Sequence, residues 1–259
     1  KYSTRFYYYG SASDYVFNGD PANDSTNVNT GKQYIDSEKV LVHRVGNTSQ
    51  IDLSMGDVHY VIGGFDLQSD YINGQPDTVL YGIHRATNIG VFVQDQMTFS
   101  DRLTLTAGLR YDYYSIKGTF MEGNVNPKIA AVYQCSPKVS VRSLLARAFR
   151  NPSISERYTK FEQGGGLKFT TSPLLRAEKL TLSAEVGTKI NLNQIRFDVA
   201  LYYNNYKDLI YYEQRQTPDG SLLFEVVNLN KAILQGFEVS AEYAPVKEIS
   251  IQAGYTYLD

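Results

Sequence analysis

Hydrophobic and polar residues alternate along most of this chain with a period of two, which predicts β-strands that have one apolar and one polar face. The clearest example is the segment 180–190. One face there holds Leu180, Leu182, Ala184, Val186 and Ile190, and the other holds Thr181, Ser183, Glu185, Gly187 and Lys189. The same pattern recurs from the first residues to the last and predicts about eleven strands. Many of them span ~10 residues or more, whereas strands of soluble proteins average ~5 to 6.

Short turns and long polar loops alternate between these strands. Tight turns are predicted near Met55, Ser100, Ser136, Leu192 and Pro245. Polar loops are predicted at 10–38, 71–86, 115–126, 151–178 and 209–222. No convincing helix intervenes. The segment 141–150 (VRSLLARAFR) could form a basic amphipathic helix, but strands flank it and no N-cap residue precedes it, so we predict a strand.

The polar face of the predicted sheet carries many charges among small residues. These charges include Arg102, Arg110, Asp112, Arg142, Glu185, Lys189, Arg196, Asp198, Glu238 and Glu242. A soluble sandwich, propeller or barrel would turn the apolar face inward, whereas charges on one face and lipid-compatible residues on the other suit a wet or plugged lumen. Strands of ~9 to 11 residues cross a bilayer, and outer-membrane barrels combine short periplasmic turns with long extracellular loops. We therefore predict an all-β fold, a transmembrane antiparallel up-and-down β-barrel with its turns in the periplasm and its loops outside.

Composition narrows the possible functions. The 259 residues include 25 Lys and Arg against 27 Asp and Glu, which gives no basic surface typical of a nucleic-acid partner. One cysteine excludes an internal disulfide, and three histidines without ligand spacing argue against a metalloenzyme, so no cofactor is predicted. The 22 Tyr and 12 Phe suit an aromatic girdle at a membrane interface. Asp14, Asp20 and Asp24 could bind calcium, but their spacing matches no calcium loop and a solvated loop is preferred.

Several segments, in order, resemble the barrel of TonB-dependent outer-membrane receptors. They are NIGVFVQDQMTFSDRLTLTAGLRYDYY at 88–114, NPKIAAVYQ at 126–134, ARAFRNPSISERY at 146–158, TSPLLRAEKLTLSAEVGTKI at 171–190, YYNNYKDLI at 202–210, VNLNKAILQGFEVSAEY at 227–243 and AGYTYLD at 253–259. Two segments depart from the family pattern: Asn151 stands where "FRAP" has Ala, and 172–178 replaces "NPNLKPE". Haem receptors of the family carry a His between these two segments. This chain has none between Pro152 and Pro173, which disfavours haem.

The resemblance implies active uptake of a scarce ligand across the outer membrane of a Gram-negative bacterium rather than catalysis. The implied ligand is a ferric siderophore, with cobalamin or haem as lesser alternatives, and the implied partners are outer-membrane lipid and the TonB complex. A receptor barrel of this kind has ~22 strands around a plugged lumen. Residues 1–259 would supply about half of that barrel, so we expect a partial barrel domain without the N-terminal plug, the TonB-contacting segment and the closing C-terminal strands. No signal peptide is found at the start.

Two groups of residues are candidates for ligand contact on the outer loops. Arg150, Arg157 and Tyr158 follow a strand at the start of loop 151–178, although ion pairs that brace the loop are the preferred reading of these charges. Tyr206, Tyr211, Tyr212 and Arg215 form an aromatic and basic group suited to anionic catechol ligands. Packing within a girdle or loop explains that second group at least as well.

Other motifs favour structural roles. Lumen charges such as Arg110, Glu185 and Glu238 are expected to pair with neighbouring strands or a plug rather than to bind ligand. The Gly164–Gly166 triplet has no Lys-Ser or Lys-Thr pair after it and is not a phosphate loop. Ser153 and Ser155 have no His and Asp partners in the pattern, so nucleophilic catalysis has no support. His84 and Arg85, at the end of an outer loop, are expected to be solvated. Two other functions stay open at this point: a passive porin-type or enzyme-bearing outer-membrane barrel, and a secreted β-rich adhesin.

Overall fold

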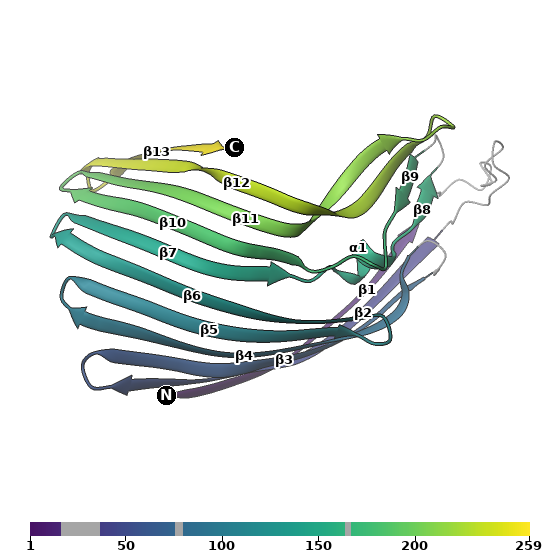
Figure 1. Ribbon diagram of the computed structural model, residues 1–259, viewed down its shortest axis with the longest axis horizontal. Coiled ribbons are helices and arrows are strands. Elements are labelled where there is room, and N and C mark those ends of the chain that lie inside the picture. Colours follow the sequence, from purple (N-terminus) through teal and green to yellow (C-terminus); the bar gives the residue numbers. More distant parts are fainter. Residues whose placement is uncertain (17–36, 76–79, 164–166) are drawn as a thin grey trace.

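The computed structural model describes residues 1–16, 37–75, 80–163 and 167–259. They form a curved sheet of thirteen strands (Figure 1). The strands are β1 (Tyr2–Val16), β2 (Ser37–Met55), β3 (His59–Gln75), β4 (Gly82–Ser100), β5 (Leu103–Ile116), β6 (Phe120–Ser136), β7 (Val139–Arg150), β8 (Phe161–Gln163), β9 (Leu167–Thr170), β10 (Glu178–Leu192), β11 (Ile195–Gln216), β12 (Leu222–Val246) and β13 (Ile249–Leu258). The long strands follow chain order with antiparallel neighbours, which confirms the predicted meander. Without the short β8 and β9, eleven strands remain, as the alternation predicts.

The predicted tight turns are confirmed, but the outer loops are shorter than predicted. Each turn joins consecutive strands across two or three residues, as in the connection from Met55 to His59. In the predicted loop 115–126, only residues 117–119 lie outside β5 and β6, and in 209–222 the strands continue to Gln216 and resume at Leu222. The ladder there includes the pairs Tyr113↔Gly123 and Glu213↔Glu225. Apolar and polar residues do not alternate regularly in these extensions, where Ile116 and Ile210 are buried, so the pattern that marks the strands fades while the backbone pairing continues.

A short helix, α1 (Ile154–Tyr158), corrects the prediction that no helix intervenes. Ser153 is its N-cap: the Glu156 amide donates to the Ser153 hydroxyl at 3.1 Å, and the Ser153 amide donates to the Glu156 carboxylate at 2.7 Å. This reciprocal pair is a capping box, and its Ser-x-x-Glu spacing is visible in the sequence. Within the described residues, no helix is long and apolar enough to cross a membrane.

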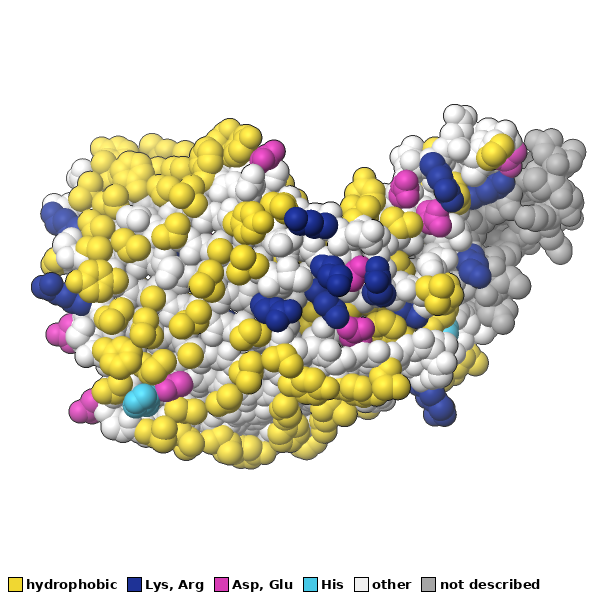
Figure 2. Space-filling model, in the orientation of Figure 1, with side chains coloured by type: hydrophobic (Ala, Val, Ile, Leu, Met, Phe, Trp, Pro, Cys, Tyr) yellow, Lys and Arg dark blue, Asp and Glu magenta, His cyan; other side chains and the backbone are white. Residues whose placement is uncertain are grey.

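The outer surface of the sheet is apolar along most of the strand length. Val186, Leu201 and Tyr255 are exposed on it, and hydrophobic side chains cover the left part of the face seen in Figure 2. Lipid, rather than a second protein layer, is the solvent that such a face requires. The two buried apolar clusters of the described chain both lie beyond it, at the outer end: Ala86, Ile116 and Ile154 form one, and Leu175, Ile210 and Val226 form the other.

A β-bulge changes the facing of one predicted apolar residue. Leu180 pairs with Tyr206 while Leu182 pairs with the adjacent Asn205, so Thr181 is an extra residue in β10. An extra residue reverses the alternation beyond it. Leu180 therefore shares the inner face with Tyr206, and its predicted place beside Leu182 is wrong.

Ion pairs between strands line the inner face, as predicted for the lumen charges. Arg110 contacts Asp66 and Asp112, each at 2.7 Å. Arg142 of β7 contacts Glu185 of β10 at 3.0 Å and Asp198 of β11 at 2.8 Å. Gly187 leaves room for this second group, since a Cβ there would lie 2.8 Å from the guanidinium carbon of Arg142.

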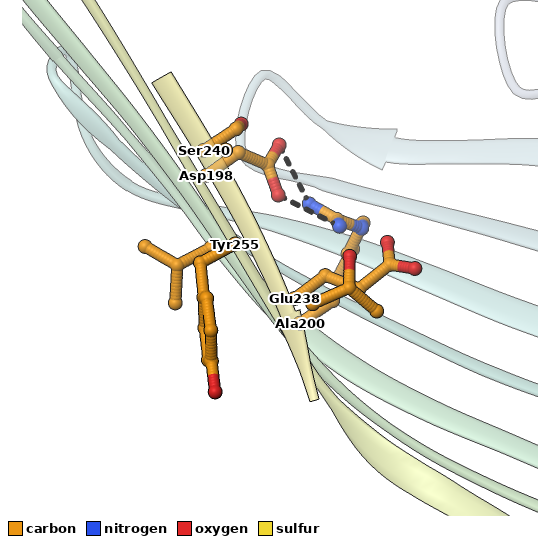
Figure 3. Close-up of a pocket in the computed structure, with 9 residues that line it drawn as sticks. Asp198, Ala200, Glu238, Ser240 and Tyr255 are labelled. Atoms are coloured by element: carbon orange, nitrogen blue, oxygen red, sulfur yellow. Dashed lines mark hydrogen bonds and ion pairs between the residues drawn. The ribbon is translucent and has the colours of Figure 1, made fainter. Parts of the chain in front are cut away.

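A recess of about 170 Å³ opens beside the Arg142 group. Asp198, Glu238 and Ser240 line it from β11 and β12. Figure 3 shows these side chains on one side of the strands and Tyr255 on the opposite side. Glu238 thus faces the inner surface as predicted, without an ion pair among the described residues.

Candidate functional site

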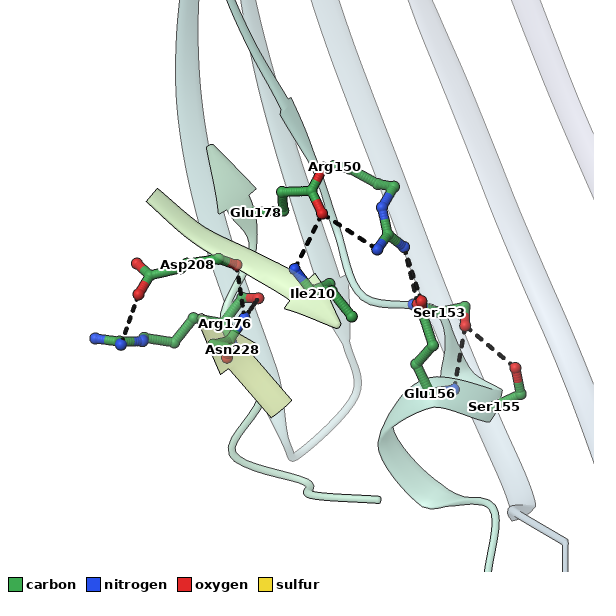
Figure 4. A network of polar contacts seen from close by, with 9 residues as sticks. All are labelled: Arg150, Ser153, Ser155, Glu156, Arg176, Glu178, Asp208, Ile210 and Asn228. Atoms are coloured by element: carbon green, nitrogen blue, oxygen red, sulfur yellow. Dashed lines mark hydrogen bonds and ion pairs between the residues drawn. The ribbon is translucent and has the colours of Figure 1, made fainter. Parts of the chain in front are cut away.

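Arg150 is the centre of a polar network at the outer end of the inner wall (Figure 4). Its guanidinium contacts Glu156 of α1 at 2.9 Å and Glu178, the first residue of β10, at 3.4 Å. The Glu178 carboxylate also accepts the backbone N–H of Ile210 at 3.0 Å. Arg150 therefore joins β7, α1 and β10, as the loop-bracing interpretation predicts. Its side chain still keeps 45% of its surface exposed.

Arg157 is buried, with 2% of its surface exposed. Its guanidinium donates to the carbonyl oxygens of Pro173 and Leu175 and lies 4.4 Å from the centroid of the Phe120 ring. Loop residues after α1 are thereby attached to the helix and to the start of β6. The side chain holds the loop in place and does not reach the surface, so direct ligand contact is not available to it in this conformation.

Tyr158 attaches the same loop to the rim of the sheet. Its ring stacks on His84 with the centroids 4.1 Å apart, and its hydroxyl donates to Thr119 Oγ1 at 2.6 Å. His84 is half-buried rather than fully solvated, which corrects the expectation for it. Burial lowers the pKa of His84 below its ordinary value, and the Arg157 cation lowers that pKa as well, while a hydrogen bond to the Tyr81 backbone opposes both.

The predicted aromatic and basic group on β11 is divided between two faces. Tyr206 and Tyr212 are an even number of residues apart and share the inner side, whereas Tyr211 and Arg215 share the other. Six residues of strand also separate Tyr206 from Tyr212 by roughly 20 Å. Arg215 contacts Glu225 of β12 at 2.7 Å. The four residues therefore do not form one cluster.

Tyr212 lies close enough to the Arg150 network for the charges of that network to act on its phenol. Partial burial raises the pKa of its phenol, the Glu156 carboxylate raises it further, and the Arg150 guanidinium acts in the opposite direction. The phenol therefore stays neutral near physiological pH. Half of the Tyr212 side chain is exposed, and the ring lies 6.2 Å from that of Phe169 on β9. A neutral, half-exposed aromatic ring near an arginine offers both stacking and hydrogen bonding to an aromatic anion.

Asn228 and Asp208, which the sequence analysis did not identify, connect segments at the outer end of the sheet. Asn228 accepts the Arg176 amide at 2.8 Å and donates to the carbonyl oxygens of Arg176 and Asp208 at 3.1 and 2.8 Å. Asp208 has a positive φ of 56°, and its carboxylate contacts Arg176 at 2.6 Å. Asn and Asp tolerate and stabilise such backbone kinks. No spacing in the sequence pairs these residues, because they come from three different strands and loops.

Another ion pair fixes the tip of the β11–β12 hairpin. Lys168 of β9 donates to Asp219 at 2.6 Å, and β9 runs parallel to Leu222–Glu225 of β12. The Lys168 ammonium, the Thr217 hydroxyl and the Ser221 amide together hold the pKa of Asp219 well below its usual range.

Among the described residues, no three His, Cys, Asp or Glu side chains lie close enough together to hold a metal ion. Of the three aspartates considered for calcium, Asp20 and Asp24 lie outside the described residues, as does the Gly164–Gly166 triplet.

Comparison with known proteins identifies the family. The family model described as "TonB dependent receptor-like, beta-barrel" matches residues 1–259. The ferrienterobactin receptor of Escherichia coli (strain K12) is 25% identical over 190 residues, which are 68% of this chain and 25% of that protein. The siderophore receptor PirA of Pseudomonas aeruginosa has a TM-score of 0.70 at 20% identity, covering 86% of this chain and 43% of that chain. The copper transporter OprC has a TM-score of 0.77 at 16% identity, covering 99% and 43%.

The chain thus spans a quarter of the curated relative and less than half of each solved chain. At these identities the solved structures establish the fold, while the family match extends over the whole chain. The family consists of receptors and transporters, not enzymes, in the outer membrane of Gram-negative bacteria. The chain belongs to the β-barrel family of TonB-dependent receptors.

Proposed function

We propose that this chain forms part of the barrel of a receptor that imports a ferric siderophore across the outer membrane, driven by the TonB complex. The observation that carries the proposal is the family match together with similarity to a ferrienterobactin receptor. Membership of a receptor family does not favour the passive porin or the adhesin. Cobalamin and haem are less favoured cargoes, and the fold shared with a copper transporter makes copper a useful comparison in the test.

In this proposal the ligand meets the mouth of the barrel at Tyr212 and Arg150. The geometry supports these two because each keeps about half of its side chain exposed and both face the inner side. A ferric catecholate carries negative charge on aromatic rings, which an arginine attracts and a tyrosine ring stacks against. Tyr211 and Arg215 lie on the opposite side of the hairpin and would contact ligand on its approach.

Arg157 and Tyr158 have a different part in the proposal. Both are committed to contacts within the protein, through Leu175 and Pro173 for Arg157 and through His84 and Thr119 for Tyr158. They would position loop 151–178 so that Arg150 and Tyr212 stay at the mouth. Tyr206 lies deeper on the inner wall, opposite Leu180, where a ligand would meet it after the mouth.

Equilibrium binding to the native protein that contains this chain tests the proposal. Ferric catecholate siderophores, haem, cobalamin and copper ions are compared on the purified protein in detergent. Ferric siderophore should bind most tightly, and Tyr212→Ala should weaken it about tenfold, the effect of one cation–π or stacking contact in a partly desolvated site.

Tyr60→Ala is the matched control, because Tyr60 is an exposed tyrosine near the opposite end of the strands. That variant should bind like the wild type. Tight binding of haem, cobalamin or copper without siderophore binding would replace the proposed cargo. Unchanged siderophore affinity in Tyr212→Ala would remove Tyr212 from the site while leaving the cargo intact.

A further inference from the structure

The backbone ladder between β6 and β7 stops before either strand ends. Its last pair is Lys128↔Ala146, although both strands continue beyond that pair. By contrast, the β5–β6 and β7–β10 ladders continue to the outer ends of these same strands. Figure 1 shows β6 running on to its hairpin with β5 while β7 ends at α1. We call this stretch without a ladder, residues 124–127 of β6 beside 147–150 of β7, the seam.

Pro127 explains why the ladder stops on the β6 side. The Gln134 amide donates to the Arg102 carbonyl, just before β5, at 2.7 Å, and the β5–β6 register has no shift. Successive amides along a strand point alternately to its two neighbours. Even-numbered amides of β6 therefore point to β5, and position 127 points to β7. Proline has no N–H to donate, so the first bond beyond Lys128 cannot form.

A β-bulge lies on the other side of β7 at the same level. Arg147 of β7, the residue just beyond the last β6 pair, opposes both Thr181 and Leu182 of β10. The Thr181 hydroxyl donates to the Asn205 carbonyl at 2.9 Å and fixes the extra residue in place. A bulge bends the strand that carries it and increases the local twist. Pro127 and the bulge together define one level at which β7 and β10 can bend away from β6.

Helix α1 crosses from the end of β7 and packs on the other side of the seam. Ile154 is buried against β4 and β5, and the Tyr158 ring stacks on His84 of β4. Nearby, Lys179 of β10 contacts Glu122 of β6 at 2.6 Å. Among the described residues, these connections across the seam are made by side chains, whereas neighbouring strands elsewhere in the wall are joined by backbone hydrogen bonds.

The closed arrangement leaves polar atoms beside the seam without partners. Asn124 of β6 is buried, and its Nδ2 has no hydrogen-bond partner in the described part of the chain. The same holds for Asn151 Oδ1, at the end of β7, and for Arg157 Nε in α1. A buried polar atom without a partner is unfavourable, and water satisfies it once it is exposed. These groups therefore oppose the packing of α1 and favour opening.

From this geometry we propose that the wall opens at the seam and that α1 is the strap that holds it closed. Opening separates the outer end of β1–β6 from that of β7–β12, while continuous ladders keep each part together. The mouth widens beside Arg150, which lies on the β7 side. The opening itself requires no ligand, and its use by the imported cargo rests on the proposed function.

Double electron–electron resonance on the intact native protein in nanodiscs tests the opening. Spin labels at Val125→Cys and Arg147→Cys, exposed positions on the two sides of the seam, report its width after Cys135→Ser removes the exposed thiol. Ile154→Ala weakens the strap without touching either label. The population at a longer distance should rise by at least about tenfold, as expected when a buried isoleucine is truncated.

Val125→Cys with Tyr111→Cys is the matched control, because both residues are exposed and lie opposite each other in the unbroken β5–β6 ladder. Its distance should stay the same in every background. Tyr158→Phe keeps the ring and loses only the bond to Thr119, so it should give a smaller shift in the same direction and replaces Ile154→Ala if that variant does not fold. A seam pair that keeps one distance in the folded strap variants overturns the inference.

A short thiol cross-linker between Val125→Cys and Arg147→Cys tests whether the cargo uses the opening. Uptake of ferric siderophore should be lost in the cross-linked protein, while equilibrium binding is retained. Uptake that survives the cross-link overturns the use of the seam by the cargo. Absence of siderophore binding before cross-linking contradicts the proposed function instead, and it leaves the spin-label result unaffected because that measurement needs no ligand.

Discussion

The wall of the sheet and its outer end use apolar residues in opposite ways. Along the wall, large apolar side chains such as Leu201 and Val186 are exposed on one face, and ion pairs occupy the other. At the outer end, apolar side chains such as Leu175 and Ile116 are buried in small clusters, and charged groups surround them. The same physical effect gives both arrangements: apolar groups avoid water, and only the outer end has water on every side.

Polar contacts differ between the two regions as well. Wall ion pairs such as Arg142 with Glu185 connect strands that the backbone ladder already joins. At the outer end, Arg157 and Asn228 connect segments that have no ladder between them. We therefore expect damage to the wall to destabilise the whole barrel, and damage to the outer end to release one loop.

The largest expected effect is on the free energy of unfolding. It compares two variants in which an exposed leucine, one on the wall and one at the outer end, is replaced by arginine. Leu201→Arg on the wall should lower the free energy of unfolding by about 2–4 kcal/mol, the cost of a cation facing the hydrocarbon. Leu174→Arg in loop 151–178, where 84% of the side chain is exposed, should change it by less than about 0.5 kcal/mol. Urea unfolding of the native protein in lipid vesicles measures both. Equal costs would show that the wall does not face lipid.

An intermediate effect, on the local opening of loop 151–178, is expected when the buried Arg157 is replaced. Arg157→Met removes the donors to the Pro173 and Leu175 carbonyls, and an unsatisfied buried acceptor costs about 1–3 kcal/mol. Loop 151–178 should open more easily by about 2–3 kcal/mol, while global unfolding stays close to that of the wild type. Limited proteolysis of the loop and amide exchange of α1 measure the local opening.

Lys160→Met is the control for the Arg157 variant, because Lys160 is an exposed cation in the same loop. It should leave proteolysis and exchange unchanged. Loss of barrel folding in Arg157→Met would contradict the separation between wall and outer end.

The smallest expected effect is the pH dependence of the stability of loop 151–178. The pKa of His84 is lowered in the folded protein, so the open loop binds the proton more readily than the closed one. The contribution of His84 is complete above its ordinary pKa of about 6.5 and is lost as pH falls below that value through the folded pKa. The protection factors of the α1 amides, which correct for the pH dependence of intrinsic exchange, should fall severalfold as pH is lowered over this range. His84→Phe keeps the stack on Tyr158 without a titrating group, and the same pH dependence in that variant would exclude His84 as its source.

The alternation of the chain was sufficient to predict the eleven long strands, the periplasmic turns and the charged inner face. Each of these depends on whether a side chain meets lipid or lumen, and in a strand that choice alternates from one residue to the next. The Ser153 and Glu156 capping box was equally local, and its spacing could have predicted α1. The extent of the outer strands could not be predicted in this way, because burial at the outer end depends on contacts with loop residues such as Ile154 and Leu175 and not on a regular alternation between lipid and lumen.

Only the tertiary structure decided which polar groups meet and which way some of them face. Arg157 resembles a surface residue in the sequence, yet contacts with Leu175 and Phe120 from other segments bury it. A single extra residue at Thr181 turns Leu180 inward. Sequence by itself thus determined the fold and the family of this protein. The proximity of Arg150, Glu156 and Glu178 emerged only in three dimensions, because it depends on segments that are apart in the chain.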